Sequence, residues 1–167
     1  MAGKMTERPS GRRPAGVVIF GTVLIFSSLV HMHKLFFDYD WYIASYGYWP
    51  TGLMVLRYCF SWGQRILGLM AGIGILRLKD IGRKIAIVVG WFTILTIYWK
   101  HPYAGFKNHT AYLDQHLGFI LKEWGYPQLS FSQFTLAAVI TACLWDILFF
   151  GSMIYYLTRP TVKAQFR

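Results

Sequence analysis

The sequence predicts an all-α integral membrane bundle of four transmembrane helices, with an additional amphipathic helix outside the membrane. Two observations predict this class. Of the 167 residues, 55% are hydrophobic and only 14% are charged, whereas soluble domains average about 25% charged residues. Four apolar stretches also approach the ~20 residues that a helix needs to cross a bilayer.

The four predicted spans alternate with short polar segments. In lipid every backbone N–H and C=O must be paired within its own segment, so each span is predicted to be a helix. We expect one transmembrane domain, residues 16–158, between a flexible basic segment (1–15) and a basic tail (159–167). The predicted spans are residues 17–37, 53–76, 85–103 and 134–157.

The basic residues predict the orientation. Net charge is +10, which in a soluble chain would suggest nucleic acid, but here the charges flank apolar stretches and no nucleic-acid partner is expected. Eleven lysines and arginines lie in the first segment, the loop between the second and third spans, and the tail; four lie on the opposite side, in the other loops or at the adjoining ends of the spans. Cytoplasmic loops carry the excess of basic residues, so both ends are predicted to be cytoplasmic.

The longest segment outside the spans contains a predicted amphipathic helix, residues 110–124. Its apolar residues recur at helical spacing, and Asn108 or Thr110 is predicted to cap it. We expect this helix to lie on the outer membrane surface. A lid packed on the bundle, a partner-docking helix and a substrate-gating helix remain alternative interpretations.

Two charged residues fall inside the spans. Arg65 and Asp146 are predicted to lie at similar depth in the second and fourth spans, and a lone charge there costs at least ~2.5–3.5 kcal/mol on insertion scales. We therefore expect an ion pair between them, with either a structural role or a role with a proton, ion or ligand. Arg57 and Gln64 are candidates for contact with an anion or a lipid headgroup, the alternative being that Arg57 reaches the outer interface.

Small residues recur at four-residue spacing in the second and fourth spans, as Gly68 and Gly72 and as Ala138 and Ala142. This pattern lets helix backbones approach closely. Packing within the chain and docking to another subunit or another copy both fit it.

The histidines raise a haem hypothesis. His31 and His101 are predicted to lie near the outer ends of the first and third spans, and two imidazoles from two helices are a haem ligand set. We nevertheless predict no cofactor, because histidines near an interface more often serve as hydrogen-bonding residues. The sequence lacks HExxH, GxSxG, P-loop and GxGxxG motifs, so no enzymatic activity is predicted.

Two stretches resemble parts of small bacterial membrane proteins: the opening Arg13-Pro14-Ala15-Gly16-Val17 and GIGILRLKDIGRKIAIVVGW around the inner loop. The resemblance implies a bacterial inner-membrane location and no activity. Together these observations predict a non-enzymatic accessory, scaffold or assembly component of a membrane complex, in contact with lipid and with other subunits or itself. A small transporter or channel component using Arg65 and Asp146 is the alternative, and a haem-binding redox subunit is a more distant one.

Overall fold

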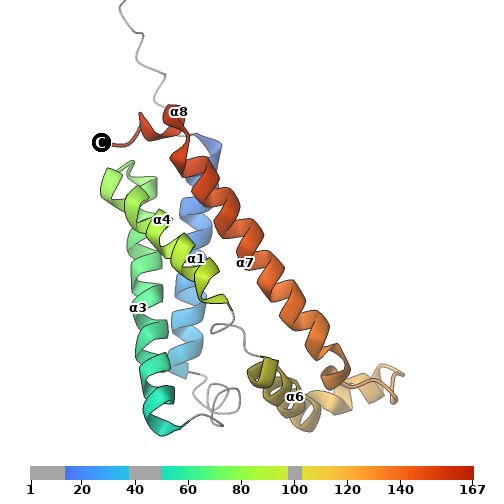
Figure 1. The fold of residues 1–167 in the computed structure, drawn as a ribbon. Coiled ribbons are helices and arrows are strands. Elements are labelled where there is room, and N and C mark those ends of the chain that lie inside the picture. The colour runs from blue at the N-terminus through green and yellow to red at the C-terminus, as the bar shows by residue number, and fades with distance from the viewer. Residues whose placement is uncertain (1–13, 38–49, 98–102) are drawn as a thin grey trace, which may run out of the picture.

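A computed structural model describes residues 14–37, 50–97 and 103–167 of the chain, and this part is helical without strands (Figure 1). Its principal helices are α1 (Ala15–Phe37), α3 (Thr51–Leu76), α4 (Asp80–Leu95), α6 (Tyr103–Glu123) and α7 (Thr135–Thr158). A 3-10 turn, η1 (Phe131–Phe134), precedes α7, and a short helix, α8 (Pro160–Lys163), follows it. The predicted all-helical class is confirmed.

Three helices are long and apolar enough to cross a membrane: α1, α3 and the segment of η1 and α7. α1 and α3 end at the predicted residues, Phe37 and Leu76. The third predicted span corresponds to α4, which has 16 residues and at a rise of ~1.5 Å per residue is about 24 Å long. That is shorter than the ~30 Å hydrocarbon core, and residues 98–102 of the predicted span lie outside the described part.

A tight reversal joins α3 to α4. Leu78 adopts a left-handed conformation (φ 53°), so its N–H reaches the carbonyl of Ile75 at 2.9 Å and the N–H of Lys79 reaches that of Gly74 at 2.9 Å. These two bonds satisfy carbonyls that the end of α3 would leave open. A Cβ added to Gly74 would lie 2.5 Å from the Cα of Gly82, so the two backbones touch where α3 and α4 diverge.

The helices pack in chain order: α1 on α3, α3 on α4 and α4 on α7. α1 and α7 also meet near the C-terminal end of α7, where the ring of Phe20 lies 5.7 Å from that of Phe149 and 5.6 Å from that of Tyr156. Figure 1 shows α7 diverging from α1 and α3 toward α6. The buried apolar core therefore lies at the end where α3, α4, α7 and α8 meet; it includes Ala71, Ile75, Ala86, Met153, Leu157, Val162 and Phe166.

α6 begins at Tyr103, well before the predicted start at residue 110. Thr110 does not cap this helix: it is buried within it, and its hydroxyl donates to the carbonyl of Phe106 at 3.0 Å. A threonine hydroxyl can bond back to a carbonyl of the preceding turn inside a helix as well as cap one. The sequence pattern did not separate these two roles.

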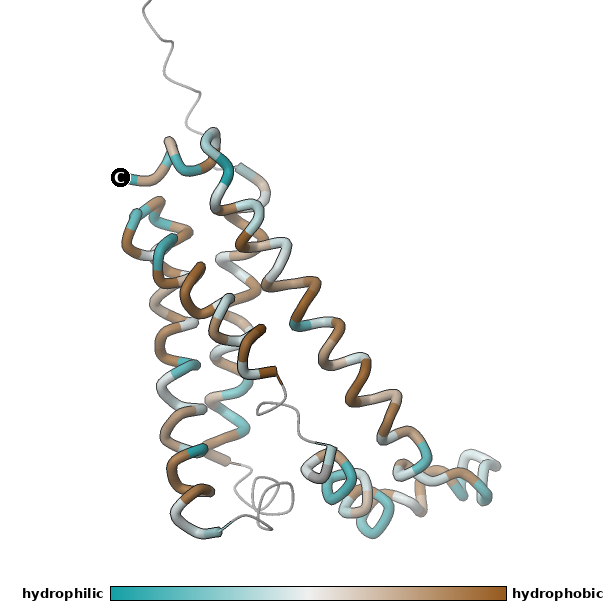
Figure 2. The backbone as a smooth tube through the Cα atoms, viewed as in Figure 1, coloured by the Kyte–Doolittle hydropathy of each residue, from teal (hydrophilic) through white to brown (hydrophobic). Residues whose placement is uncertain are grey.

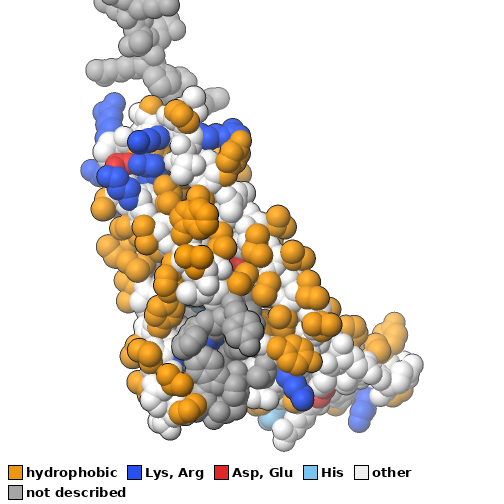
Figure 3. Space-filling model, in the orientation of Figure 1, with side chains coloured by type: hydrophobic (Ala, Val, Ile, Leu, Met, Phe, Trp, Pro, Cys, Tyr) orange, Lys and Arg blue, Asp and Glu red, His pale blue; other side chains and the backbone are white. Residues whose placement is uncertain are grey.

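Polar and apolar residues divide the molecule along its length. Hydrophobic residues dominate the middle of α1, α3, α4 and α7, and hydrophilic ones gather at the two ends (Figure 2). Many large apolar side chains are exposed, such as Leu95 at 77% and Leu148 at 68%. Lysines and arginines cluster at the end that carries α8 (Figure 3). An apolar belt between polar ends is the surface expected of a membrane protein.

Candidate functional site

Charged residues occur along the apolar lengths of α3 and α7. Asp146 lies near the middle of α7 and is only 6% exposed, and Arg57 in α3 is 5% exposed. Arg65 lies near the middle of α3 and is partly buried. α3 and α7 each pack on α4 without extensive packing on each other. The predicted Arg65–Asp146 pair would therefore have to join two helices that both pack on α4 and not extensively on each other. The pair itself stays a prediction.

Gln64 takes part in a contact between helices. Its side-chain amide donates to the hydroxyl of Thr93 in α4 at 2.8 Å, and Thr93 is fully buried. A polar pair shielded from lipid satisfies both groups and ties α3 to α4, at a typical strength of about 0.6–2 kcal/mol in membrane helices. Thr93 was not identified from the sequence, where it reads as one more residue of an apolar span.

Gly68 and Gly72 lie in the contact between α3 and α1. A Cβ at Gly68 would lie 2.6 Å from the Ser28 hydroxyl oxygen, and one at Gly72 would lie 2.8 Å from the backbone oxygen of Gly21. Close approach of these helices therefore occurs within the chain. Ala138 and Ala142, by contrast, are partly exposed on α7.

The haem hypothesis rests on residues that the structure places only in part. His31 is exposed, and its Nδ1 donates to the carbonyl of Ser27 at 2.7 Å. His101 lies outside the described residues. Among the residues the structure describes, no group of three or more His, Cys, Asp or Glu side chains could hold a metal ion.

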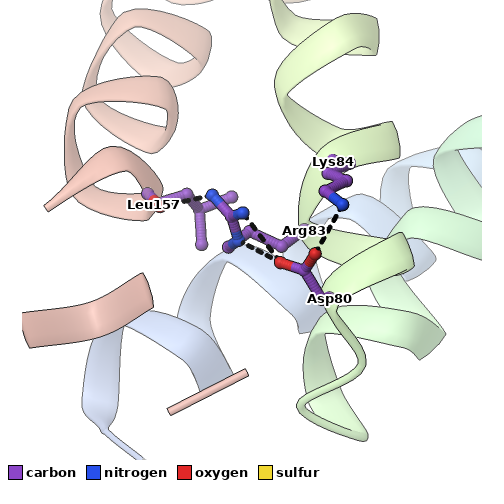
Figure 4. A network of polar contacts seen from close by, with 4 residues as sticks. All are labelled: Asp80, Arg83, Lys84 and Leu157. Atoms are coloured by element: carbon purple, nitrogen blue, oxygen red, sulfur yellow. Dashed lines mark hydrogen bonds and ion pairs between the residues drawn. The ribbon is translucent and has the colours of Figure 1, made fainter. Parts of the chain in front are cut away.

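An ionic network that the sequence reasoning missed joins the start of α4 to the end of α7 (Figure 4). The Asp80 carboxylate contacts the Arg83 guanidinium at 2.7 Å and the Lys84 ammonium at 2.8 Å. Hydrogen bonds from Lys84 and then Arg83 hold the pKa of Asp80 below its usual value. Arg83, only 6% exposed, also donates to the carbonyl of Leu157 at 3.4 Å. The positive charge of this buried arginine is thus neutralised by the Asp80 carboxylate.

The residues after α7 are integrated into the same end. The backbone N–H of Arg167 donates to the carbonyl of Leu78 at 3.0 Å, and that of Asp80 donates to the carbonyl of Arg167 at 2.9 Å. Val162 and Phe166 are buried in the core. The alternation of these apolar residues with basic ones was the sequence signal that could have indicated a docked segment in place of a simple tail.

A second contact missed from the sequence fastens α6 to the start of α7. Asp114 accepts hydrogen bonds from the backbone N–H groups of Phe131 and Ser132, the former at 2.5 Å and the latter at 3.1 Å, and from the Ser132 hydroxyl. Burial alone would raise the pKa of Asp114, but these three bonds outweigh it and lower the pKa.

The Thr110 and Thr135 hydroxyl oxygens, 2.7 Å apart and buried, share a hydrogen bond one helical turn before Asp114.

The contact of Asp114 is a capping interaction, because its carboxylate accepts from the free N–H groups at a helix start. Here a distant helix supplies the cap. Pairing at that sequence separation has no local pattern, which is why it was missed.

His109 precedes this contact on α6. Burial, and secondarily the positive charge of Lys34, lower its pKa. The lowered pKa favours a neutral imidazole at physiological pH.

No protein-family model, curated protein or solved structure matches this chain.

Proposed function

We propose that the chain is a four-span membrane protein that acts as a non-enzymatic accessory, scaffold or assembly component of a membrane complex. In this proposal α4 completes a crossing together with residues that follow it, the end carrying α8 faces the cytoplasm, and α6 lies at the outer surface. The basic residues gathered at the α8 end support this orientation (Figure 3).

The one-sided packing of α7 carries the proposal. Its C-terminal half packs on α4, where Ile154 lies against Gly90. Figure 1 shows its N-terminal half extending beyond α4 toward α6, and there Leu136, Ile140 and Leu144 are each at least half exposed. Helices in lipid associate through close van der Waals packing, so a long apolar half-helix that the described helices leave largely uncovered is suited to receive a helix of another subunit.

Ala138 and Ala142 lie in this half of α7 on the face opposite to Leu136, Ile140 and Leu144. They are partly exposed and supply the small residues that close packing requires. Two polar contacts of the described part hold its own helices together: Gln64 bonds to Thr93, and Asp114 bonds to η1. This use of polar residues fits a scaffold better than a catalyst.

Native mass spectrometry of the tagged protein, extracted mildly from its own membranes, tests the proposal. Subunits that co-purify in fixed stoichiometry are expected. The double variant Ala138→Leu/Ala142→Leu should lose them, whereas Gly151→Ala, in the other half of the same helix and with open space around it, should retain them. A wild-type protein that appears only as a monomer or homo-oligomer would refute the accessory role.

The buried charges favour one second candidate, a small transporter or channel component. Asp146 and Arg57 are both more than nine-tenths buried, and ionisable residues inside the membrane often mark ion or proton pathways. Proteoliposomes with a pH-sensitive dye distinguish the two functions. Proton or ion flux that Asp146→Asn abolishes would establish transport, and the absence of flux in the wild type would exclude it for the ions tested.

A further inference from the structure

We propose that the end of the molecule carrying α8 is a binding surface for the headgroups of anionic phospholipids. Six exposed basic residues come together there from two segments that are distant in sequence: Arg77, Lys79 and Lys84 around the α3–α4 connection, and Arg159, Lys163 and Arg167 at and after the end of α7. Figure 3 shows this concentration of positive charge at one end of the apolar belt.

The positive charge is not balanced by acidic groups of the described chain. Asp80 is the acidic side chain of this end among the described residues, and it is already engaged by the buried Arg83 and by Lys84. Of the six exposed basic residues, the five other than Lys84 therefore remain available to an external anion.

The surface is also held in place. The two backbone hydrogen bonds of Arg167, with Leu78 and Asp80, fix its position beside Lys79. The N–H of Lys163 donates to the carbonyl of Arg159 at 2.8 Å, which sets these two residues one turn apart. Arg159 is in turn held by Tyr155, whose ring lies 4.5 Å away and whose hydroxyl accepts a hydrogen bond at 2.7 Å. Charges that are already positioned lose less entropy when they bind.

The location selects a lipid over an acidic protein. The exposed apolar side chains of Ile81 (65%) and Tyr155 (63%) adjoin the basic residues, so the surface combines cations with apolar groups at the level where the spans end. Phosphodiester groups above acyl chains have the complementary arrangement, and basic residues at this level are attracted to anionic leaflets. The inference holds for either orientation of the chain.

The test uses the purified full chain in detergent with equal amounts of phosphatidylglycerol and phosphatidylcholine of identical acyl chains, and native mass spectrometry to count the lipids retained. Preferential retention of phosphatidylglycerol is expected. Lys79→Gln/Lys163→Gln should weaken it at least about tenfold, from roughly fivefold per side chain. The control Lys107→Gln/Lys122→Gln removes the same charge from exposed residues of α6 at the opposite end and should leave it unchanged. Thermal unfolding of each variant verifies that it is folded.

Four results would overturn the proposal. The first is equal retention of the two lipids by the wild type, and the second is an equal loss in both double variants, which would reflect net charge alone. In the third, inorganic phosphate displaces phosphatidylglycerol at an ionic strength where chloride does not, which would identify a site for the free anion. In the fourth, the Lys79→Gln/Lys163→Gln variant loses a co-purifying acidic protein but retains its lipids. That result would assign the surface to a protein partner and refute the proposal of a lipid-binding surface.

Discussion

The contact of Asp114 with the start of α7 leads to the sharpest stability prediction. Replacing Asp114 with alanine removes an acceptor from two backbone N–H groups and one hydroxyl. Removing a capping side chain costs about 0.5–2 kcal/mol, and bonds to a charged acceptor fall at the upper end. Because Asp114 is partly exposed, we expect about 1–2 kcal/mol, with the loss confined to the docking of α6 on α7.

Hydrogen exchange of the protein in nanodiscs measures this loss. A change of 1–2 kcal/mol corresponds to amides of α6 exchanging about 5- to 30-fold faster, while amides of the α3–α4 contact should be unaffected. Asp114→Asn, which keeps one acceptor oxygen, should show a smaller effect. Glu123→Ala removes an exposed carboxylate from the same helix and should have none.

The same contact predicts a pH dependence with a defined sign. The pKa of Asp114 is lowered in the folded protein below 3.8, the ordinary value of an aspartate carboxyl, so the folded state binds its proton less readily than the unfolded state does. The stabilisation is therefore fully present above about pH 5 and is lost as the pH falls below 3.8 through the folded pKa. A loss of protection of the α6 amides between about pH 5 and 8, after correction for the intrinsic exchange rate at each pH, or an Asp114→Ala variant that exchanges like the wild type, would refute this account of the contact.

Three further predictions concern the membrane helices. Gly82→Ala should destabilise the protein by about 1–3 kcal/mol, seen as a lower melting temperature in detergent, because its Cβ would lie 2.4 Å from the Gly74 backbone; Gly63→Ala, with open space around it, should not. Arg65→Ala and Asp146→Ala should each reduce accumulation in the membrane, and exchanging the two residues should partly restore it; normal levels of both single variants would show that the pair is not structural. The purified protein should show no Soret band, whose presence would revive the haem hypothesis.

Features with a repeating local signal were predictable from the sequence. The apolar lengths of α1 and α3 determined where these helices end, because charge and hydropathy change sharply beyond Phe37 and Leu76. The third predicted span shows the limit of that signal. The apolar residues continue past Leu95, whereas helix α4 ends there and Thr96 forms a turn. Hydropathy measures transfer into lipid and does not indicate where a helix turns.

Contacts between distant segments were not predictable by the same reasoning. Asp80 appears in the sequence as an ordinary polar residue of a connecting segment, and Asp114 as one of the polar face of the predicted amphipathic helix. In the structure one neutralises a buried arginine, and the other caps a helix seventeen residues further along the chain. Their roles depend on which helices meet, and a single sequence contains no direct record of that. Glycines are an intermediate case: their spacing predicted close packing at Gly68 and Gly72, but only the structure shows that α1 is the partner.

The distribution of these contacts bears on how a partner would bind. Fixed interactions hold the two ends of α7: Arg83 reaches Leu157 at one end, and Asp114 holds η1 at the other. Between them the N-terminal half of α7 presents exposed Leu136, Ile140 and Leu144 to its surroundings. A helix anchored at both ends loses little conformational freedom when another helix packs on its middle, which lowers the entropic cost of association. The two anchors that hold the chain together would thus also prepare α7 to receive another subunit, and weakening the Asp114 contact should reduce co-purification of that subunit without altering Ala138 or Ala142.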